Sequence, residues 1–332
     1  MRVPLTWDWT VGMIFLLIAI VTGWAVTRDH KTTYVEPTFG GATGDALYSL
    51  PPQDIAALEA AAGTAIAEPP AAEAATAPPA VAPQQPTRPA PAVGATSYVV
   101  LERSCGTVLG GFAEHERLAP ASLTKIITAL VVVERVPLTD GVVSDVSASG
   151  MKGSSVMGLE PGDRLSVNDL LYGLMLRSGN DAALVLAKHT AGTVDAFVAL
   201  MNAKAREIGL QDTQFTNPHG LDSPGLYSTS YDMAQAGRAL LQNPVLARMS
   251  STPEYQAAWD KPPMRNGNKL LKSYEGAYGV KNGYTENARQ TLVAAAQRDG
   301  RDIVVSLFGS PDRYTDARAL LNWAFTSTHP AC

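Results

Sequence analysis

The stretch Ser97-Tyr-Val-Val-Leu-Glu-Arg-Ser-Cys-Gly-Thr-Val-Leu-Gly-Gly-Phe112 marks the start of the folded part of this chain. Ser97–Leu101 and Thr107–Phe112 are rich in apolar and β-branched residues, and a polar turn at Ser104–Gly106 separates them. This arrangement predicts a β-hairpin. Further strands are expected near the C-terminal end, at 279–285, 290–296 and 302–309.

The sequence between these two groups of strands is helical in pattern. Helices are expected at 121–136, 167–175, 181–191 and 194–208, with a last helix at 314–325. The order is therefore strands, helices, strands and a final helix. In one domain this order predicts an α+β fold, in which an antiparallel sheet flanked by helices pairs its first strands with its last and carries an all-helical insertion.

Two segments precede this domain. The uncharged run 9–27 is about as long, as a helix, as a bilayer core is thick. Residues 1–30 are therefore expected to be either a transmembrane anchor, which enters the membrane through 9–27, or a signal peptide. Alanine and proline dominate the stretch that follows, so residues 31–96 are predicted to be a disordered Ala/Pro-rich linker. This leaves 97–332 as the folded domain.

Charge and composition exclude several classes of site. The 332-residue chain holds 26 Lys and Arg against 31 Asp and Glu, a formal net charge of -5. A nucleic-acid surface needs clustered basic residues in excess, so we expect no nucleic-acid partner. With two cysteines and five scattered histidines, we expect no metal site and no cofactor.

The first motif that can carry chemistry is Pro120-Ala-Ser122-Leu-Thr-Lys125, at the start of an almost wholly apolar helix. Positions i and i+3 of a helix share one face, so the hydroxyl and the amine can meet. Burial lowers the pKa of a lysine, and a neutral amine can take the proton of a serine. The alternative is that Ser122 only caps the helix while Lys125 extends to water.

A second motif, Ser178-Gly-Asn180-Asp, lies in a tight turn between two expected helices. Helix capping alone explains such residues. The functional alternative is that Ser178 and Asn180 both project into one cleft, where they offer a hydroxyl and an amide.

A third motif is Lys281-Asn282-Gly283-Tyr284. Asn-Gly between extended residues is a strong signal for a type I′ hairpin. The functional alternative is an edge strand, in which Lys281 supplies charge, Gly283 allows close approach and backbone N–H groups bind a substrate.

Ser-x-x-Lys, a Ser-x-Asn element and a Lys-x-Gly element occur together in class A β-lactamases and penicillin-binding proteins. With these motifs, and with Asn217-Pro-His-Gly-Leu221 and Tyr227-Ser-Thr between them, the domain resembles the serine-type D-alanyl-D-alanine carboxypeptidases, the low-molecular-mass penicillin-binding proteins. The resemblance implies a β-lactamase/transpeptidase-like fold.

The resemblance also implies roles for the residues of the three motifs. Ser122 would be the nucleophile that forms an acyl-enzyme with a peptidoglycan stem peptide ending in D-Ala-D-Ala, and Lys125 its base. Ser178 and Asn180 would relay protons and orient the substrate. Lys281, Asn282, Gly283 and Tyr284 would bind substrate, with the N–H groups of Ser122 and Tyr284 as oxyanion hole. β-Lactams would acylate Ser122 as covalent inhibitors.

The chain departs from the family pattern at Asn282, where the relatives carry threonine. We therefore expect altered substrate or β-lactam affinity more than loss of activity. The motifs leave two alternatives open: a DD-endopeptidase acting on crosslinked peptidoglycan, and a non-catalytic wall-binding protein of the same fold. His189 and His219 are expected to be structural.

The resemblance implies a place in the cell envelope, on the extracytoplasmic face, reached by means of the N-terminal segment. In that oxidising compartment Cys105 and Cys332 can form a disulfide that ties the C-terminus to the first hairpin.

Overall fold

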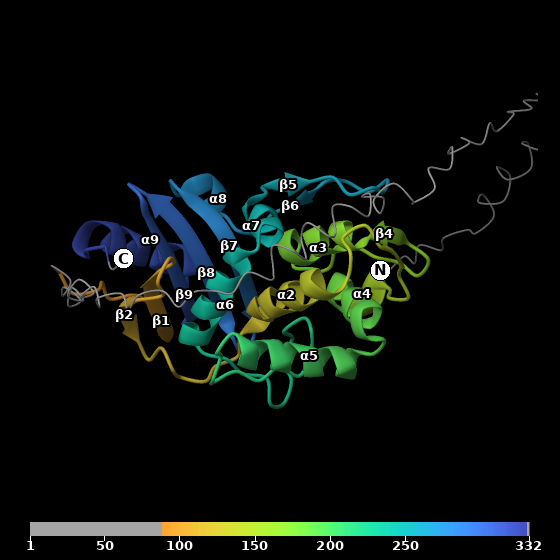
Figure 1. The fold of residues 1–332 in the computed structure, drawn as a ribbon, viewed down its shortest axis with the longest axis horizontal. Coiled ribbons are helices and arrows are strands. Elements are labelled where there is room, and N and C mark those ends of the chain that lie inside the picture. The colour runs from red at the N-terminus through yellow and green to blue at the C-terminus, as the bar shows by residue number, and fades with distance from the viewer. Residues whose placement is uncertain (1–87, 331) are drawn as a thin grey trace, which may run out of the picture. The chain divides into compact units, whose positions relative to one another are not determined.

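The structure is a computed structural model, and it describes residues 88–330 and residue 332. All of these belong to one compact unit. The predicted anchor or signal peptide at 1–30, and the linker as far as residue 87, lie outside the described residues. Helices and strands both contribute, and the sheet is antiparallel (Figure 1), so the predicted α+β class is confirmed.

The main sheet has five strands in the order β2-β1-β9-β8-β7. The strands are β1 (Ser97–Glu102), β2 (Val108–Phe112), β7 (Ala277–Thr285), β8 (Arg289–Arg298) and β9 (Arg301–Ser310). The first strand, β1, pairs antiparallel with the last, β9, with Val100 opposite Val305. The predicted pairing of the first strands with the last is therefore confirmed, and β7 is an edge strand.

Helices fill the chain between β2 and β7. They are the short 3₁₀ helix η1 (Ala121–Thr124), α2 (Lys125–Arg135), η2 (Ala148–Met151), α3 (Val167–Leu176), α4 (Asn180–Ala191), α5 (Val194–Glu207), α6 (Ser230–Gln242), α7 (Pro244–Ser251) and α8 (Leu270–Ser273). The last helix is α9 (Arg313–Ser327). Two small hairpins, β3–β4 (Gly141–Val143, Arg164–Ser166) and β5–β6 (Glu254–Tyr255, Met264–Arg265), complete the insertion. The sequence pattern did not predict η2, α6, α7, α8 or the two small hairpins.

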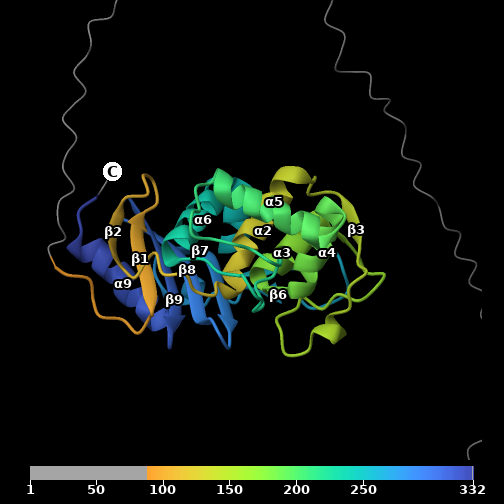
Figure 2. The same cartoon turned by 90° about the horizontal axis from the view of Figure 1, so that it is seen from below.

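Strands β1, β8 and β9 of the sheet are buried on both faces over most of their length, whereas β2 is largely exposed. In β1, Val99 and Leu101 belong to the core shared with the inserted helices, whereas Tyr98 and Val100 pack with α9. This division follows from the period of two of a β-strand, and it explains why the strands are continuously apolar. Figures 1 and 2 show α9 on one face of the sheet and α6 on the other. The site described below lies where β7 meets η1.

Residues 88–96, which precede β1, also contact the domain. The indole Nε1 of Trp323 in α9 donates to the carbonyl of Arg88 at 2.9 Å. Ala95 is buried, and Ala90 and Val93 pack against the same cluster as α9. These residues therefore pack with the sheet domain, although sequence analysis places them in the linker.

Cys105 and Cys332 form a disulfide, as the sequence analysis expected, with their Cα atoms 6.2 Å apart. Cys105 lies in the turn between β1 and β2, so the bond ties the C-terminal residue to the first hairpin. A disulfide that closes so long a loop restricts the unfolded chain.

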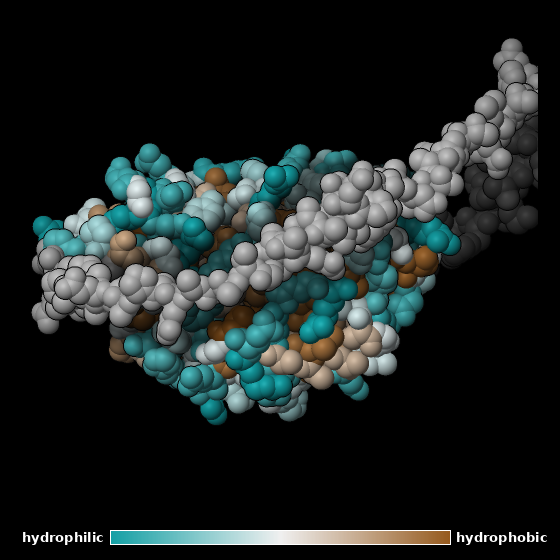
Figure 3. Space-filling model, in the orientation of Figure 1, coloured by the Kyte–Doolittle hydropathy of each residue, from teal (hydrophilic) through white to brown (hydrophobic). Residues whose placement is uncertain are grey.

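The surface of the described part is largely hydrophilic on the face that Figure 3 presents, with hydrophobic residues in smaller patches. Among the described residues, no single helix has the length and apolar character needed to cross a membrane, and one bent pair, α4 with α5, meets that test by length and composition only. The large apolar side chains that remain exposed are Val108, Phe112, Val143, Leu221 and Tyr284.

Candidate active site

Ser122 and Lys125 meet at the junction of η1 and α2. The Nζ of Lys125 donates to the Oγ of Ser122 at 2.9 Å. Ser122 is half-buried, whereas Lys125 is fully buried. The expected meeting of hydroxyl and amine on one face is therefore observed, and Lys125 does not extend to water.

Lys125 has two further acceptors. Its Nζ donates to the Oδ1 of Asn180 at 2.7 Å and to the backbone carbonyl of His219 at 2.5 Å. Burial lowers the pKa of this amine well below its ordinary value, and the charge of Lys281 lowers it further, while Asp181 acts in the opposite direction. A neutral amine beside a serine hydroxyl is the arrangement that makes a serine nucleophilic.

The turn Ser178–Asp181 is held by backbone contacts to a neighbouring loop. The carboxylate of Asp181, fully buried, accepts the N–H groups of Met157, Gly158 and Leu159 at 2.9, 2.8 and 2.9 Å. Gly179 is the N-cap residue of α4, and Arg177 is the C-cap residue of α3. Asp181 was not among the predicted site residues, and it fixes the turn from which Asn180 reaches Lys125.

Ser178 lies in the same turn with a positive φ of 58°. A residue other than glycine is uncommon in this region of backbone conformation. Its buried hydroxyl has no hydrogen-bond partner among the described residues. A buried hydroxyl of this kind normally has a partner, so Ser178 retains unused capacity to donate and to accept.

Lys281–Tyr284 lie inside strand β7 and not in a hairpin turn. The edge-strand alternative is therefore the observed one, and the type I′ hairpin is wrong, because Asn282 and Gly283 pair with Leu292 and Thr291 of β8. A Cβ atom on Gly283 would lie 2.7 Å from the backbone nitrogen of Ser122. Glycine is needed at this position because β7 approaches η1 so closely.

Lys281 is the second buried lysine of the site. Its Nζ donates to the carbonyl of Asn282 at 2.9 Å. Burial, and secondly the charge of Arg313, lower its pKa to about 7. Arg313 was not predicted; its guanidinium is buried and donates to the carbonyls of Gly283 and Thr291 at 2.5 and 3.1 Å. It thereby fastens the end of β7 that faces Ser122.

Asn282 and Tyr284 point to the other side of β7, since side chains alternate along a strand. The amide of Asn282 lies next to Gly267, whose missing Cβ would be 3.5 and 3.6 Å from its oxygen and nitrogen. Tyr284 is 56% exposed, and its hydroxyl lies 3.4 Å from the carboxylate of Glu286. Neither side chain is fully buried.

The loop Asn217–Leu221 contributes to the site through its backbone. Asn217 accepts the N–H groups of His219 and Gly220 at 3.2 and 2.6 Å, which directs the carbonyl of His219 toward Lys125. Gly220 has a φ of 86°, and a Cβ there would lie 1.9 Å from the carbonyl oxygen of Ala121. The imidazole of His219 is neutral, because burial and the neighbouring Lys125 lower its pKa to about 4.

Two separate segments thus bring Ser122, Lys125 and Asn180 into direct hydrogen bonding, and Lys281 of a third segment lies near enough to act on the charge of Lys125. Ser178 lies in the turn that carries Asn180 but makes no hydrogen bond to any of these residues. None of the groups of His, Cys, Asp and Glu among residues 88–330 and 332 has an arrangement suited to a metal ion. What the site offers is a hydroxyl, an amine with a lowered pKa, a second cationic group and an edge strand.

The family described as D-alanyl-D-alanine carboxypeptidase matches residues 82–312. The chain belongs to this family. It is 41% identical over 250 residues to D-alanyl-D-alanine carboxypeptidase DacC of Escherichia coli K12, and 38% identical over 249 residues to D-alanyl-D-alanine carboxypeptidase DacF of Bacillus subtilis. Each alignment covers 71% of this chain, and the chain spans 62% of the length of the first relative and 64% of the second.

Solved structures agree with this assignment. Penicillin binding protein 6B of Escherichia coli superimposes with a TM-score of 0.68 at 35% identity, over 72% of this chain and 80% of that one. A D-alanyl-D-alanine carboxypeptidase of Mycobacterium tuberculosis does so with a TM-score of 0.68 at 34% identity, over 75% and 100%. The predicted resemblance and the β-lactamase/transpeptidase-like fold are confirmed.

Proposed function

We propose that this member of the family is a serine-type D-Ala-D-Ala carboxypeptidase that trims peptidoglycan stem peptides through an acyl-enzyme on Ser122. The observation that carries the proposal is the 2.9 Å hydrogen bond between Ser122 and a fully buried Lys125 whose pKa is lowered. The names of the relatives, all D-alanyl-D-alanine carboxypeptidases, support the same substrate class.

In the acylation step, neutral Lys125 takes the proton of the Ser122 hydroxyl as the oxygen attacks the carbonyl carbon of the penultimate D-Ala. The negative charge that develops on the carbonyl oxygen is stabilised by the N–H groups of Ser122 and Tyr284. The peptide C–N bond then breaks, and the leaving D-Ala takes a proton from Lys125, with the Ser178 hydroxyl as the proposed relay. Water hydrolyses the ester in the second step, which restores the hydroxyl of Ser122.

Substrate binding is assigned to β7. Protonated Lys281 attracts the terminal carboxylate of the substrate, and the amide of Asn282 donates to it. Gly283 lets the substrate backbone approach the strand, and Asn180 orients it from the opposite wall. β-Lactams enter the same site as mimics of D-Ala-D-Ala and acylate Ser122.

We place the domain on the extracytoplasmic side of the cell envelope, where its substrate lies. The Cys105–Cys332 disulfide supports an oxidising compartment. Residues 9–27 are proposed to bring the chain to the membrane, as a retained anchor or as a cleaved signal peptide. The Ala/Pro-rich stretch from residue 31 is proposed to act as a linker up to the segment 88–96, which packs with the domain.

Exposure of the purified protein to penicillin, followed by intact-mass measurement, tests the proposal. We expect one covalent adduct on the wild type and none on Ser122→Ala. Digestion of purified muropeptides then separates the two hydrolytic activities, since free D-Ala supports a carboxypeptidase and resolved crosslinked dimers an endopeptidase. A protein with neither adduct nor product would contradict the proposal in favour of a wall-binding role.

A further inference from the structure

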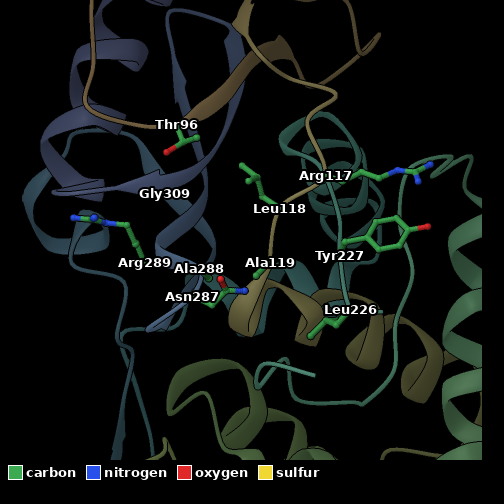
Figure 4. A pocket seen from close by; sticks show the side chains of 10 residues that line it. All are labelled: Thr96, Arg117, Leu118, Ala119, Leu226, Tyr227, Asn287, Ala288, Arg289 and Gly309. Atoms are coloured by element: carbon green, nitrogen blue, oxygen red, sulfur yellow. The ribbon is translucent and has the colours of Figure 1, made fainter. Parts of the chain in front are cut away.

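A pocket of about 320 Å³ lies beside the site, and no residue of the proposed mechanism lines it (Figure 4). Its floor and walls are formed by Leu118, Ala119, Leu226 and Ala288, with Thr96 and Gly309 at the end of the sheet. Two arginines, Arg117 and Arg289, stand on opposite sides of it. The pocket therefore combines an apolar floor with cationic sides.

Residues that line the pocket adjoin segments of the site along the chain. On one wall, Leu118 and Ala119 lead directly into η1, and Leu118 is fixed by backbone hydrogen bonds of 2.8 and 2.9 Å with Ser228. On the other wall, the hydroxyl of Thr285 accepts the N–H of Ala288 at 3.0 Å. It also donates to Asp222 at 2.8 Å. Both walls are therefore held in place by hydrogen bonds within the domain.

The direction of β7 indicates which part of a bound substrate would lie toward the pocket, namely the acyl half, which precedes the scissile bond. Lys281 lies at one end of the motif, Gly283 is level with the nitrogen of Ser122, and Thr285 leads to the pocket. A substrate with its terminal carboxylate at Lys281 and its scissile carbonyl at Ser122 must extend its acyl half past Thr285. An extended peptide advances about 3.3 Å per residue, so the residues before D-Ala-D-Ala run in the direction of the pocket.

The two arginines differ in what they already bind. Arg117 pairs with Asp212 at 2.8 Å and lies over the ring of Tyr227, 4.8 Å from its centroid. Arg289 is exposed and has no hydrogen bond, ion pair or ring contact with any residue that the structure describes. Its backbone has a φ of 53°, a conformation that residues other than glycine adopt at a cost. Its guanidinium points outward at the rim in Figure 4, where rotation of its side chain can bring it to a ligand.

We propose that this pocket binds a carboxylate-bearing residue in the acyl half of the stem peptide, with Arg289 as the cationic contact and Leu118, Ala119 and Leu226 against the aliphatic part. The proposal rests on the proposed function, because it takes the direction of the substrate from it. In this proposal Arg289 contributes to the selection of substrates that carry a carboxylate and takes no part in bond cleavage.

Synthetic N-acetylated peptides ending in D-Ala-D-Ala test the proposal. One pair carries a carboxylate or a carboxamide side chain directly before D-Ala-D-Ala, and a second pair carries it one position earlier. We expect the wild type to favour the carboxylate in at least one pair by roughly threefold to tenfold in kcat/KM, as for a partly exposed ion pair. This preference should shrink as salt is added.

Arg289→Gln is expected to bring the carboxylate-to-carboxamide ratio close to one. The matched control is Arg206→Gln, an exposed arginine on α5 with no side-chain partner in the described residues, which is expected to keep the wild-type ratio. Equal rates within both pairs for the wild type, or an unchanged ratio in Arg289→Gln, would overturn the proposal. Labelling by fluorescent penicillin is followed in parallel. Failure of the proposed function shows as loss of labelling, whereas failure of the pocket leaves labelling intact.

Discussion

The site has a helical wall, formed by η1 and α2, and a strand wall, formed by β7. Each wall contains a buried lysine, and the two lysines differ in their hydrogen bonds. Lys125, in the helical wall, directs its amine at three oxygen acceptors, on Ser122, Asn180 and His219. Lys281, in β7, donates to one backbone carbonyl, that of Asn282. Lys125 therefore has three oxygen atoms within hydrogen-bonding distance, one of them the hydroxyl whose proton its neutral form can accept, whereas Lys281 has one and keeps donors to spare.

This difference teaches that similar burial can serve opposite purposes. Desolvation lowers the pKa of both amines. The fixed acceptors of Lys125 hold it against Ser122, where its neutral form can take a proton. The spare donors of Lys281, with a pKa of about 7, suit a group that holds an anion. The comparison therefore assigns proton transfer to the helical wall and carboxylate binding to the strand wall.

Replacement of Lys125 tests the assignment of proton transfer to the helical wall, where we expect the largest effect. Lys125→Met is expected to slow penicillin acylation by about 10²- to 10⁴-fold, because general-base catalysis contributes about that much. The measurement is the rate of adduct formation at saturating penicillin. Lys188→Met, at an exposed lysine that pairs with Asp145, is the control and is expected to acylate at the wild-type rate.

A Lys125→Met variant that acylates within tenfold of the wild type, with an unchanged unfolding transition, would place the base elsewhere. The assignment of proton transfer to the helical wall would then be wrong.

The pH dependence of peptide hydrolysis tests the strand wall. Below pH 7 Lys281 carries a proton, and above it the amine becomes neutral, so kcat/KM for a D-Ala-D-Ala peptide should fall as pH rises through about 7. At the acid end the rate should fall as Lys125 gains a proton. Lys281→Met is expected to lose the alkaline decline and to lower kcat/KM at pH 6 by about 10- to 100-fold. Persistence of the decline in Lys281→Met would assign it to another group.

Much of the site was predictable because its residues carry their chemistry in their side chains. The spacing of Ser122 and Lys125 predicted that they share a face, and Ser178 and Asn180 flank a predicted turn. The joint occurrence of the three motifs, through the resemblance to the family, selected the functional alternatives over helix capping. The strands of the sheet were predictable for a similar reason, since runs such as Val99–Leu101 are apolar without interruption.

The residues of the site that were not predicted act through backbone atoms or through contacts between segments that are far apart in the sequence. The acceptor at His219 is a carbonyl, and nothing in the identity of a residue marks its carbonyl as functional. Asp181 binds the N–H groups of a loop more than twenty residues away. Helix α6 did carry a local signal, because Thr229 caps it by accepting the N–H of Asp232, and this signal was not used.

The smallest effect is expected at Asn282, where the strand wall departs from the family. The side chain is half-buried beside Gly267 and has no hydrogen bond within the described residues. Its amide can donate to a carboxylate much as a threonine hydroxyl would. Asn282→Thr is therefore expected to leave turnover within about tenfold, or about 1.4 kcal/mol in barrier. Steady-state hydrolysis of a D-Ala-D-Ala peptide measures this.

Asn282→Ala is the control for Asn282→Thr, because alanine removes the side-chain amide donor and leaves the backbone of β7 in place. We expect it to raise KM more than it lowers kcat, since the carboxylate is bound in the ground state and in the transition state alike. A gain of several orders of magnitude in Asn282→Thr would show instead that asparagine impairs the native site. The strand wall would then be the part of the cleft that limits the enzyme, and Lys281 alone would not account for carboxylate binding.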